Sequence, residues 1–230
     1  MDRSLAFEEL VLTAPTDDLG DEPMARGTAD AVEFRMDLAV DPLEQLRAYD
    51  GVLPLIATNR AEWEGGGAAD DPARLAALET AAEHDAVAAI DVELRSIEAG
   101  DADALLDHAA DRTVPVIVSV HDFDRTPAEE TLVDLLRRAC NHGTVGKLAV
   151  TATGPADVLD LLSATWTLVT DGHQVATMCM GGAGRHSRAI APLYGSCIAY
   201  APVDPERATA PGQYDLSTLR SLIDQLRAED

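Results

Sequence analysis

The segment that decides the fold comprises residues 114–150 and reads VPVIVSVHDFDRTPAEETLVDLLRRACNHGTVGKLAV. It begins and ends with apolar runs, Val114–Val120 and Val145–Val150, whose length and composition are typical of buried β-strands. Between them, Pro127–Cys140 forms a helical pattern that opens with a proline, a residue favoured in the first turn of a helix. A strand, a helix and a second strand in this order predict a parallel βαβ unit.

The same alternation continues in both directions along the chain. Eight strands are predicted, at Leu10–Thr13, Ala31–Asp37, Val52–Thr58, Ala86–Glu93, Val114–Val120, Val145–Val150, Gln174–Met180 and Ser196–Tyr200. Helices are predicted at Pro42–Ala48, Asp71–His84, Asp101–Ala110, Pro127–Cys140, Pro155–Leu168 and Leu216–Ala228. Eight βα units in 230 residues favour a (β/α)₈ TIM barrel, slightly shorter than the usual ~250 residues. No linker or repeat divides the chain, so we expect a single domain over residues 1–230; a doubly wound open sheet is the alternative fold.

The chain is strongly acidic, with 41 Asp and Glu residues against 17 Lys and Arg residues and a formal net charge of −24. Such a charge repels nucleic acid and anionic membranes, so we expect neither as a partner. The acidic residues are scattered along the chain, lysine is almost absent and only 4% of residues are aromatic. These features together indicate adaptation to molar salt, where the screening length falls to about 3 Å and self-repulsion fades.

The sequence contains no apolar run of membrane length and no signal-like stretch in residues 1–10, which predicts a cytoplasmic protein. Its three cysteines, Cys140, Cys179 and Cys197, are an odd number and lack CxxC or metal-type spacing. We therefore expect neither a disulfide framework nor a zinc site.

Lys147 is the only lysine in the chain, and it lies inside a predicted buried strand. Arginine can replace lysine as a charge, but it does not lose its proton and cannot become a neutral nucleophile. A surface lysine that has survived by chance is the alternative explanation. A buried position argues against it, because lysine is almost never found inside a protein without a partner or a function.

In a barrel of this class, functional residues gather at the C-terminal ends of the strands. Polar residues follow this rule in strand after strand. They are Glu33 and Arg35 in the second strand, Arg60 and Glu64 after the third, Asp91 and Glu93 in the fourth, His121 after the fifth, Lys147 in the sixth, Arg185, Ser187 and Arg188 after the seventh, and Thr209 and Gln213 after the eighth. Convergence of so many polar side chains on one rim indicates an active site.

Several of these residues lie in runs that resemble one family. The runs are Glu33–Asp37 (EFRMD), Arg60–Gly66, Ser119–Phe123 (SVHDF), Lys147 in its short strand, Ser187–Arg188 and Ala210–Gln213 (APGQ). In their joint order and spacing they resemble type I 3-dehydroquinase, over almost the whole chain. The resemblance implies elimination of water from 3-dehydroquinate to give 3-dehydroshikimate, on a TIM barrel and without metal or cofactor. It also implies a homodimer, the usual state in the family, although the sequence does not indicate which helices would pair.

The resemblance implies roles for three catalytic residues. Lys147 would form a Schiff base with the substrate ketone, and the amine must be neutral to attack, helped by an apolar position and nearby arginines. His121 would remove the proton next to the imine and return a proton to the departing hydroxyl. Glu64 would hold the imidazole through its second nitrogen; a loop carboxylate in water is the alternative.

The remaining rim residues suit the carboxylate and hydroxyls of the substrate. The resemblance assigns this role to Glu33, Arg35, Arg60, Arg188, Thr209 and Gln213, and Thr13 at the end of the first strand is a further candidate. A guanidinium such as that of Arg188 matches a carboxylate in shape and charge. For Glu33 and Arg35 a buried salt bridge that supports the barrel is the competing explanation.

Two other functions are consistent with the pattern. A class I Schiff-base aldolase also uses a barrel lysine, but it needs an acid–base group for carbon–carbon cleavage and often a phosphate site. The only feature that resembles a phosphate site is the group of glycines at 181, 182 and 184. A catalytically silent acidic barrel that acts as a binding protein is less consistent, because Lys147 and His121 lie at the ends of adjacent strands.

Overall fold

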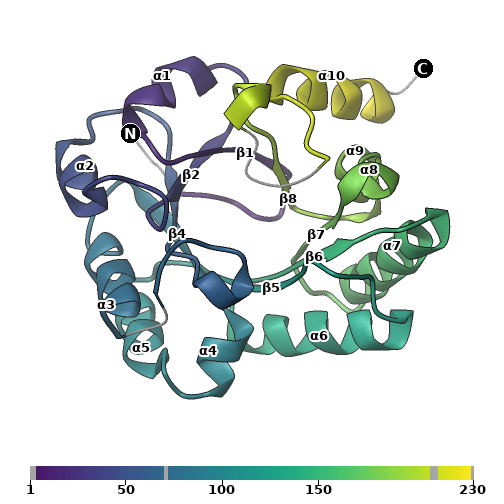
Figure 1. Ribbon diagram of the computed structural model, residues 1–230, viewed down its shortest axis with the longest axis horizontal. Coiled ribbons are helices and arrows are strands. Elements are labelled where there is room, and N and C mark those ends of the chain that lie inside the picture. Colours follow the sequence, from purple (N-terminus) through teal and green to yellow (C-terminus); the bar gives the residue numbers. More distant parts are fainter. Residues whose placement is uncertain (1–3, 70–71, 208–211, 229–230) are drawn as a thin grey trace.

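The computed structural model describes residues 4–69, 72–207 and 212–228 of the chain. In this part of the chain eight parallel strands form one sheet, and helices surround it (Figure 1). The strands are β1 (Val11–Thr16), β2 (Ala31–Arg35), β3 (Leu55–Thr58), β4 (Val87–Glu93), β5 (Val116–Asp122), β6 (Val145–Thr151), β7 (Val175–Met180) and β8 (Ile198–Tyr200). Their order, β7-β6-β5-β4-β3-β2-β1-β8, follows the chain around a nearly closed barrel. The predicted (β/α)₈ barrel is therefore confirmed, and the doubly wound alternative is wrong because the strand order shows no reversal.

The barrel closes between β7 and β8 through a short contact near the start of both strands. Val175 and Ser196 form an isolated parallel bridge, and the Cys197 amide donates to the Val175 carbonyl at 2.8 Å. Further along β7, the Thr177 amide donates to Ser196 Oγ at 3.0 Å. A side chain thus takes the place of a backbone acceptor at this seam.

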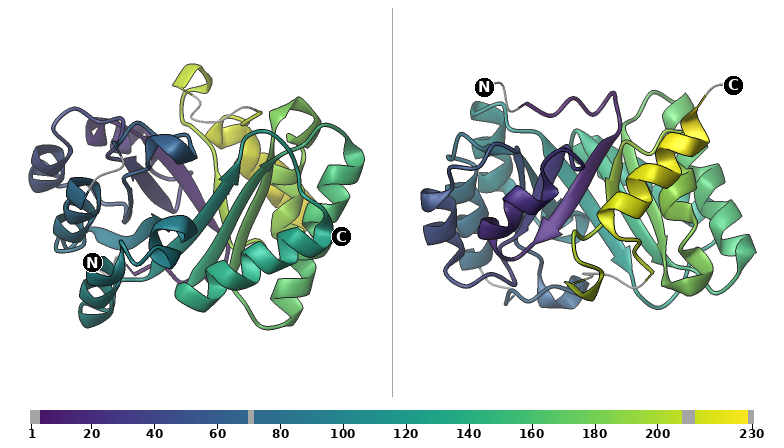
Figure 2. Two further views of the ribbon diagram at one scale, coloured as in Figure 1. Left: turned by 60° about the horizontal axis from the view of Figure 1, so that its bottom comes forward. Right: turned by 90° about the horizontal axis from the view of Figure 1, so that it is seen from above.

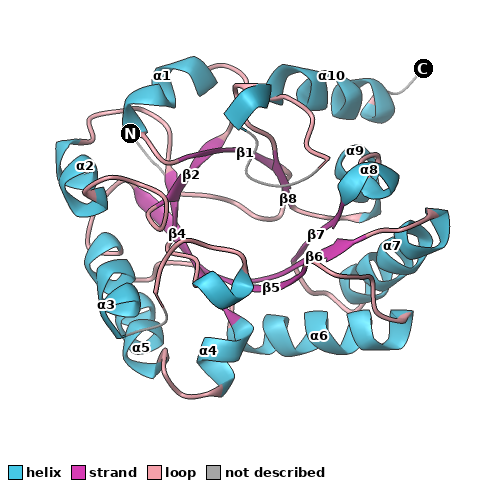
Figure 3. Ribbon diagram, viewed as in Figure 1, coloured by secondary structure: helices cyan, strands magenta, loops and turns pink. Residues whose placement is uncertain are grey.

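Helices form the outer layer (Figure 3). They are α1 (Glu22–Ala25), α2 (Pro42–Ala48), α3 (Pro72–Ala81), α4 (Leu94–Glu98), α5 (Asp103–Asp111), α6 (Glu129–His142), α7 (Pro155–Thr170), α8 (Gly181–Gly184), α9 (Ser187–Ile190) and α10 (Leu216–Arg227). The six predicted helices all form, although α6 begins two residues after Pro127. The sequence did not indicate α1, α4, α8 and α9, because four or five residues are too few to show a helical period. No helix in the described part of the chain is long and apolar enough to cross a membrane.

Of the strands that begin later than predicted, two do so directly after a proline. β3 begins at Leu55 and β5 at Val116, each directly after a proline, Pro54 or Pro115. Proline has no N–H to donate to the ladder, so regular pairing starts at the next residue. β5 continues to Asp122, which places His121 inside the strand rather than after it.

The side chains of each strand alternate between the barrel interior and the helices. In β6, Val145 and Ala149 belong to the interior cluster, whereas Leu148 and Val150 pack against α6 and α7. Lys147 lies on the interior side by the same alternation. The strand pattern therefore directs the one lysine of the chain into the barrel.

The barrel interior is filled at the end where the strands begin. Val11, Ile56, Ala89 and Ile117 pack there, and Phe7 from the segment before β1 joins them. Figure 2 (right) shows that segment crossing the end of the barrel at which the strands start. Polar side chains of the interior are thus confined to the opposite, C-terminal end.

Candidate active site

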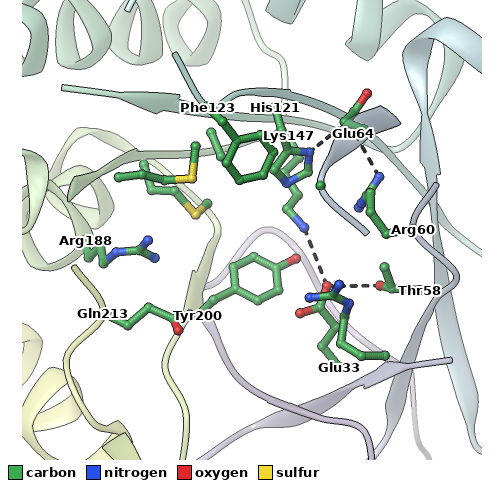
Figure 4. A pocket seen from close by; sticks show the side chains of 15 residues that line it. Glu33, Thr58, Arg60, Glu64, His121, Phe123, Lys147, Arg188, Tyr200 and Gln213 are labelled. Atoms are coloured by element: carbon green, nitrogen blue, oxygen red, sulfur yellow. Dashed lines mark hydrogen bonds and ion pairs between the residues drawn. The ribbon is translucent and has the colours of Figure 1, made fainter. Parts of the chain in front are cut away.

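A cavity opens at the C-terminal end of the barrel (Figure 4). Six of the eight strands, together with the loops after β3 and β8 and the helix α9, contribute to its wall. The lining residues are Glu33, Arg35, Thr58, Arg60, Glu64, Gly65, His121, Phe123, Lys147, Ala149, Met178, Met180, Arg188, Tyr200 and Gln213. The structure thus brings together eight of the ten residues that the sequence indicated for this site.

Lys147 lies at the inner end of the cavity and is only 4% exposed. Its Nζ donates to Asp91 Oδ2 at 2.8 Å and lies 3.6 Å from Glu33 Oε1. It also lies 4.3 Å from the centre of the Tyr200 ring. Its direct partners are thus two carboxylates and an aromatic face, and the arginines expected nearby, Arg35 and Arg60, line the same cavity.

Asp91 links Lys147 to Arg60. The guanidinium of Arg60 donates to Asp91 Oδ1 at 2.6 Å and lies 3.2 Å from Glu93 Oε1, and Glu93 in turn pairs with Arg74 at 2.7 Å. Burial alone would raise the pKa of the Asp91 carboxyl, but the adjacent Arg60 and Lys147 cations hold it below its ordinary value. Asp91 is therefore a permanent anion beneath the cavity.

His121 and Glu64 form a hydrogen-bonded pair at the wall of the cavity. His121 Nδ1 lies 2.8 Å from Glu64 Oε1, so an imidazole with its proton on Nδ1 donates to the carboxyl and keeps the Nε2 lone pair free. Burial lowers the pKa of His121 well below 6.5, and the Arg60 and Lys147 cations lower it further. Burial also raises the pKa of Glu64 to about 8, although Arg60 opposes this. The imidazole is therefore neutral near pH 7 and able to accept a proton.

The strand register places His121 close to Lys147. Lys147 pairs with Ser119 across β5 and β6, and His121 lies two residues further along the same face of β5. Figure 4 shows both side chains directed into the cavity. A base and an amine thus face the same small volume.

Glycines shape the loop that carries Glu64. Gly65 has a positive φ of 77°, and a Cβ there would lie 2.4 Å from the Phe123 ring. A Cβ on Gly66 would lie 2.0 Å from the Arg60 carbonyl oxygen, closer than any side chain tolerates. Only glycine fits both positions, and the tight turn brings the Glu64 carboxyl back to His121.

Glu33 and Arg35 line the cavity from β2, but they do not pair with each other. Arg35 instead pairs with Asp37 through two hydrogen bonds of 2.9 and 2.6 Å. Glu33 accepts a hydrogen bond from Thr58 Oγ1 at 3.0 Å and faces Lys147. Each residue thus takes part in an ion pair and also lines the cavity, so a supporting role and a binding role are compatible.

The other predicted binding residues differ in their placement. Arg188 on α9 and Gln213 after β8 line the cavity, and burial lowers the pKa of Arg188 to about 10. Thr13 is fully buried and is not among the lining residues. Thr209 lies outside the described residues.

The sequence did not assign a role to Thr58, Met178, Met180 or Tyr200, although all four line the cavity. A signal was available, because each lies at or near the C-terminal end of a strand, and Met178 and Met180 alternate toward the interior. Apolar and aromatic residues at these ends resemble ordinary core and were therefore overlooked. Asp91 was visible as a polar residue inside a strand, but its pairing with Lys147 was not.

The arrangement suits a particular chemistry. A buried amine, a neutral imidazole and a buried guanidinium converge on a cavity that fits one small molecule. An amine in such a position forms an imine with a carbonyl, and a base beside it removes a proton from the neighbouring carbon. Among the described residues, no group of three or more His, Cys, Asp or Glu side chains could hold a metal ion.

Comparisons with known proteins agree with this chemistry. A family model described as "Type I 3-dehydroquinase" matches residues 10–230. A 3-dehydroquinate dehydratase from Haloarcula marismortui is 61% identical over 226 residues, which cover 97% of this chain and 99% of the relative. One from Halobacterium salinarum is 49% identical over 226 residues, covering 97% and 100%. A solved structure, the 3-dehydroquinate dehydratase of Geobacillus kaustophilus, matches with a TM-score of 0.84 and 29% identity over 96% of this chain and 93% of that chain.

Proposed function

The chain belongs to the type I 3-dehydroquinase family, and we propose that Lys147, His121 and Glu64 carry out its reaction. The reaction removes water from 3-dehydroquinate to give 3-dehydroshikimate, a step of the shikimate pathway. Both relatives compared above come from halophilic archaea, in agreement with the salt adaptation that the acidic composition indicates.

Lys147 acts as the nucleophile. Its Nζ attacks the ketone carbon, and loss of the ketone oxygen as water leaves a protonated imine. The imine withdraws electrons from the adjacent carbon, so that a proton there becomes acidic enough for a histidine to remove. The observation that carries this assignment is the burial of the only lysine of the chain in a cavity that it shares with His121.

His121 acts as both base and acid. Nε2 takes the proton next to the imine and then returns a proton to the departing hydroxyl, so the carbon–oxygen bond breaks as the carbon–carbon double bond forms. The lowered pKa of His121 supports the first step, because the imidazole is neutral before the reaction. Glu64 fixes the ring through Nδ1 and so directs Nε2 toward the substrate.

The binding residues divide by charge. Arg188 receives the substrate carboxylate, since its guanidinium lies in the cavity wall and matches that group in shape. Glu33, Arg35, Arg60 and Gln213 face the hydroxyls, and Thr209 on the segment before Gln213 completes this set. The aldolase alternative receives no comparable support, because the described residues of the cavity add no evidence for a phosphate site to the glycines at 181, 182 and 184.

Borohydride trapping tests the assignment. Sodium borohydride, added during turnover of 3-dehydroquinate in molar KCl, should fix the mass of the ligand onto the peptide that contains Lys147. Lys147→Ala should abolish the adduct, whereas His121→Ala should still form it but release 3-dehydroshikimate far more slowly. An unmodified Lys147 peptide in the active wild-type enzyme would exclude the imine.

The same preparation distinguishes the competing functions. Release of 3-dehydroshikimate raises ultraviolet absorbance, because the product contains a conjugated enone. An aldolase would instead release two smaller carbonyl compounds from its own substrate, and a binding protein would release nothing. Absence of the absorbance rise at every salt concentration would contradict the dehydratase reaction for this chain.

A further inference from the structure

Tyr200 at the end of β8 carries a polar group whose role the reaction above leaves open. Its side chain is only 4% exposed, and its Oη is buried without a hydrogen-bond partner in the described part of the chain. A buried hydroxyl without a partner destabilises a folded protein, and interiors rarely contain one. Such a group at the wall of a ligand cavity points to a partner that arrives with the ligand.

The hydroxyl lies beside the reacting amine. Lys147 Nζ sits over the face of the Tyr200 ring, 4.3 Å from its centre. Figure 4 shows the hydroxyl end of the ring directed toward the side of the cavity where Lys147 Nζ and the Glu33 carboxylate lie. Atoms of a substrate bonded to Nζ therefore lie against the Tyr200 ring, on the side of the cavity toward which its hydroxyl is directed.

The neighbouring donors are already directed at carboxylates. Thr58 Oγ1 donates to Glu33, and Lys147 Nζ and the Arg60 guanidinium both donate to Asp91. The Tyr200 hydroxyl has no such acceptor among the described residues. It is thus the neutral donor beside Nζ that is available for a substrate oxygen.

We propose that Tyr200 Oη donates a hydrogen bond to the ketone oxygen of the substrate while Lys147 Nζ attacks the ketone carbon. The inference rests on the proposed function, in which Lys147 forms the imine. The ketone oxygen is the substrate oxygen that lies nearest Nζ, and so the first candidate for the hydroxyl, because it is bonded to the same carbon as Nζ once the nitrogen has added.

The atoms and electrons of this step balance without a further reactant. The Nζ–carbon bond forms as the carbonyl π electrons move to oxygen, where negative charge develops next to Oη. Two of the three protons of the original ammonium group leave with that oxygen as water, and the third remains on the iminium nitrogen. Tyr200 keeps its own proton and stabilises the charge on oxygen, as a donor in an oxyanion hole does.

The surroundings keep this hydroxyl protonated. Burial raises the pKa of Tyr200 well above 10, and the Glu33 and Asp91 carboxylates raise it further. The hydroxyl is thus a donor over the whole working pH range. Its ring supports the same arrangement, because an aromatic face attracts a lysine cation.

Tyr200→Phe tests the proposal, because it retains the ring and removes only the hydroxyl. The variant is mixed rapidly with 3-dehydroquinate in molar KCl and quenched with borohydride at increasing times, and the modified Lys147 peptide is quantified by mass. The trapped fraction should form about 10-fold or more slowly than in wild type. Tyr194→Phe, which removes a hydroxyl from an exposed tyrosine, should match wild type.

A second readout separates donation to the ketone oxygen from general distortion of the site. After the imine has formed, the ketone oxygen is gone. The rate constant for conversion of the imine to the enone, obtained by fitting the trapped fraction and the enone absorbance of a single turnover together as two sequential steps, should therefore change little in Tyr200→Phe. Thermal unfolding should also be unchanged or occur at a higher temperature, because the lost hydroxyl had no partner among the described residues.

Two results would overturn the inference. Trapping in Tyr200→Phe at the wild-type rate would show that Oη does not assist imine formation, and an equal fall in the rate constants for imine formation and for its conversion to the enone would indicate distortion instead. Neither result touches the proposed function, which is tested on wild type itself by the adduct on Lys147 and by the enone absorbance.

Discussion

Replacement of Asp91 by asparagine should destabilise the protein far more than the same exchange of carboxylate for amide in an equally short ion pair at the surface. Asp91→Asn keeps the shape of the side chain but removes the charge to which Arg60 and Lys147 donate at 2.6 and 2.8 Å. The side chains of both cations are only 5% exposed, so water does not replace the lost carboxylate. Breaking a buried pair in this way costs about 3–5 kcal/mol, because the two buried cations are left with longer ion pairs only, Arg60 with Glu93 at 3.2 Å and Lys147 with Glu33 at 3.6 Å.

The surface pair between Glu98 and Arg138 provides a matched control. Its shortest distance is also 2.6 Å, but its side chains are 36% and 42% exposed. Glu98→Gln should therefore cost less than about 1 kcal/mol. The comparison isolates burial from distance, because both substitutions exchange a carboxylate for an amide.

Thermal unfolding in molar KCl, followed by circular dichroism, measures the difference. For a chain of this size, each kcal/mol shifts Tm by roughly 2–4 °C, so Asp91→Asn should unfold about 6–20 °C below wild type. Glu98→Gln should remain within about 4 °C of wild type. A loss in Asp91→Asn no larger than in the control would refute the view that this carboxylate neutralises the interior of the barrel.

Three further predictions concern the His121–Glu64 pair and its loop. The acid limb of kcat/KM, which reports the free enzyme, should lie below pH 6.5, because the lowered pKa keeps His121 neutral until the solution is more acidic; a midpoint above pH 6.5 would contradict this. The pKa of Glu64 is about 8 in the fold against 4.5 in the unfolded chain, so the native state holds the proton more tightly and stability should fall as pH rises from about 4.5 to 8. The free energy of unfolding of Glu64→Gln, measured by denaturation across this pH range, should lack this fall. A pH profile of stability identical to that of wild type would contradict the prediction. Gly66→Ala should lower Tm strongly, since its Cβ would lie 2.0 Å from a carbonyl oxygen, whereas Gly154→Ala, with nothing within 4 Å, should not.

The sequence predicted the barrel because its strands and helices alternate with few interruptions, and the alternation survives errors of two or three residues at each boundary. It also predicted Lys147 and His121, since a polar residue inside or directly after an apolar strand is visible in one dimension. The bond between Lys147 and Asp91 is not visible in this way. These residues lie on β6 and β4, which are separated by β5 and meet only because the sheet curves.

The errors at individual residues have equally local causes. Thr13 lies on the interior side of β1, two residues after Val11 of the interior cluster, yet packing covers its hydroxyl and the cavity does not reach it. The ion-pair partners of Glu33 and Arg35 were not visible in the sequence. Glu33 faces Lys147 across the barrel, and Arg35 pairs with Asp37 just after β2.

The chain of buried ion pairs from Arg74 through Glu93, Arg60 and Asp91 to Lys147 has a consequence for evolution in brine. Dissolved ions screen the attraction between exposed groups within a few ångströms, but they screen buried pairs much less. Salt should therefore alter the charges around Lys147 and His121 less than those of the acidic side chains at the surface. Surface charges can therefore change during adaptation to higher or lower salt while the ion pairs at the centre of the barrel stay the same.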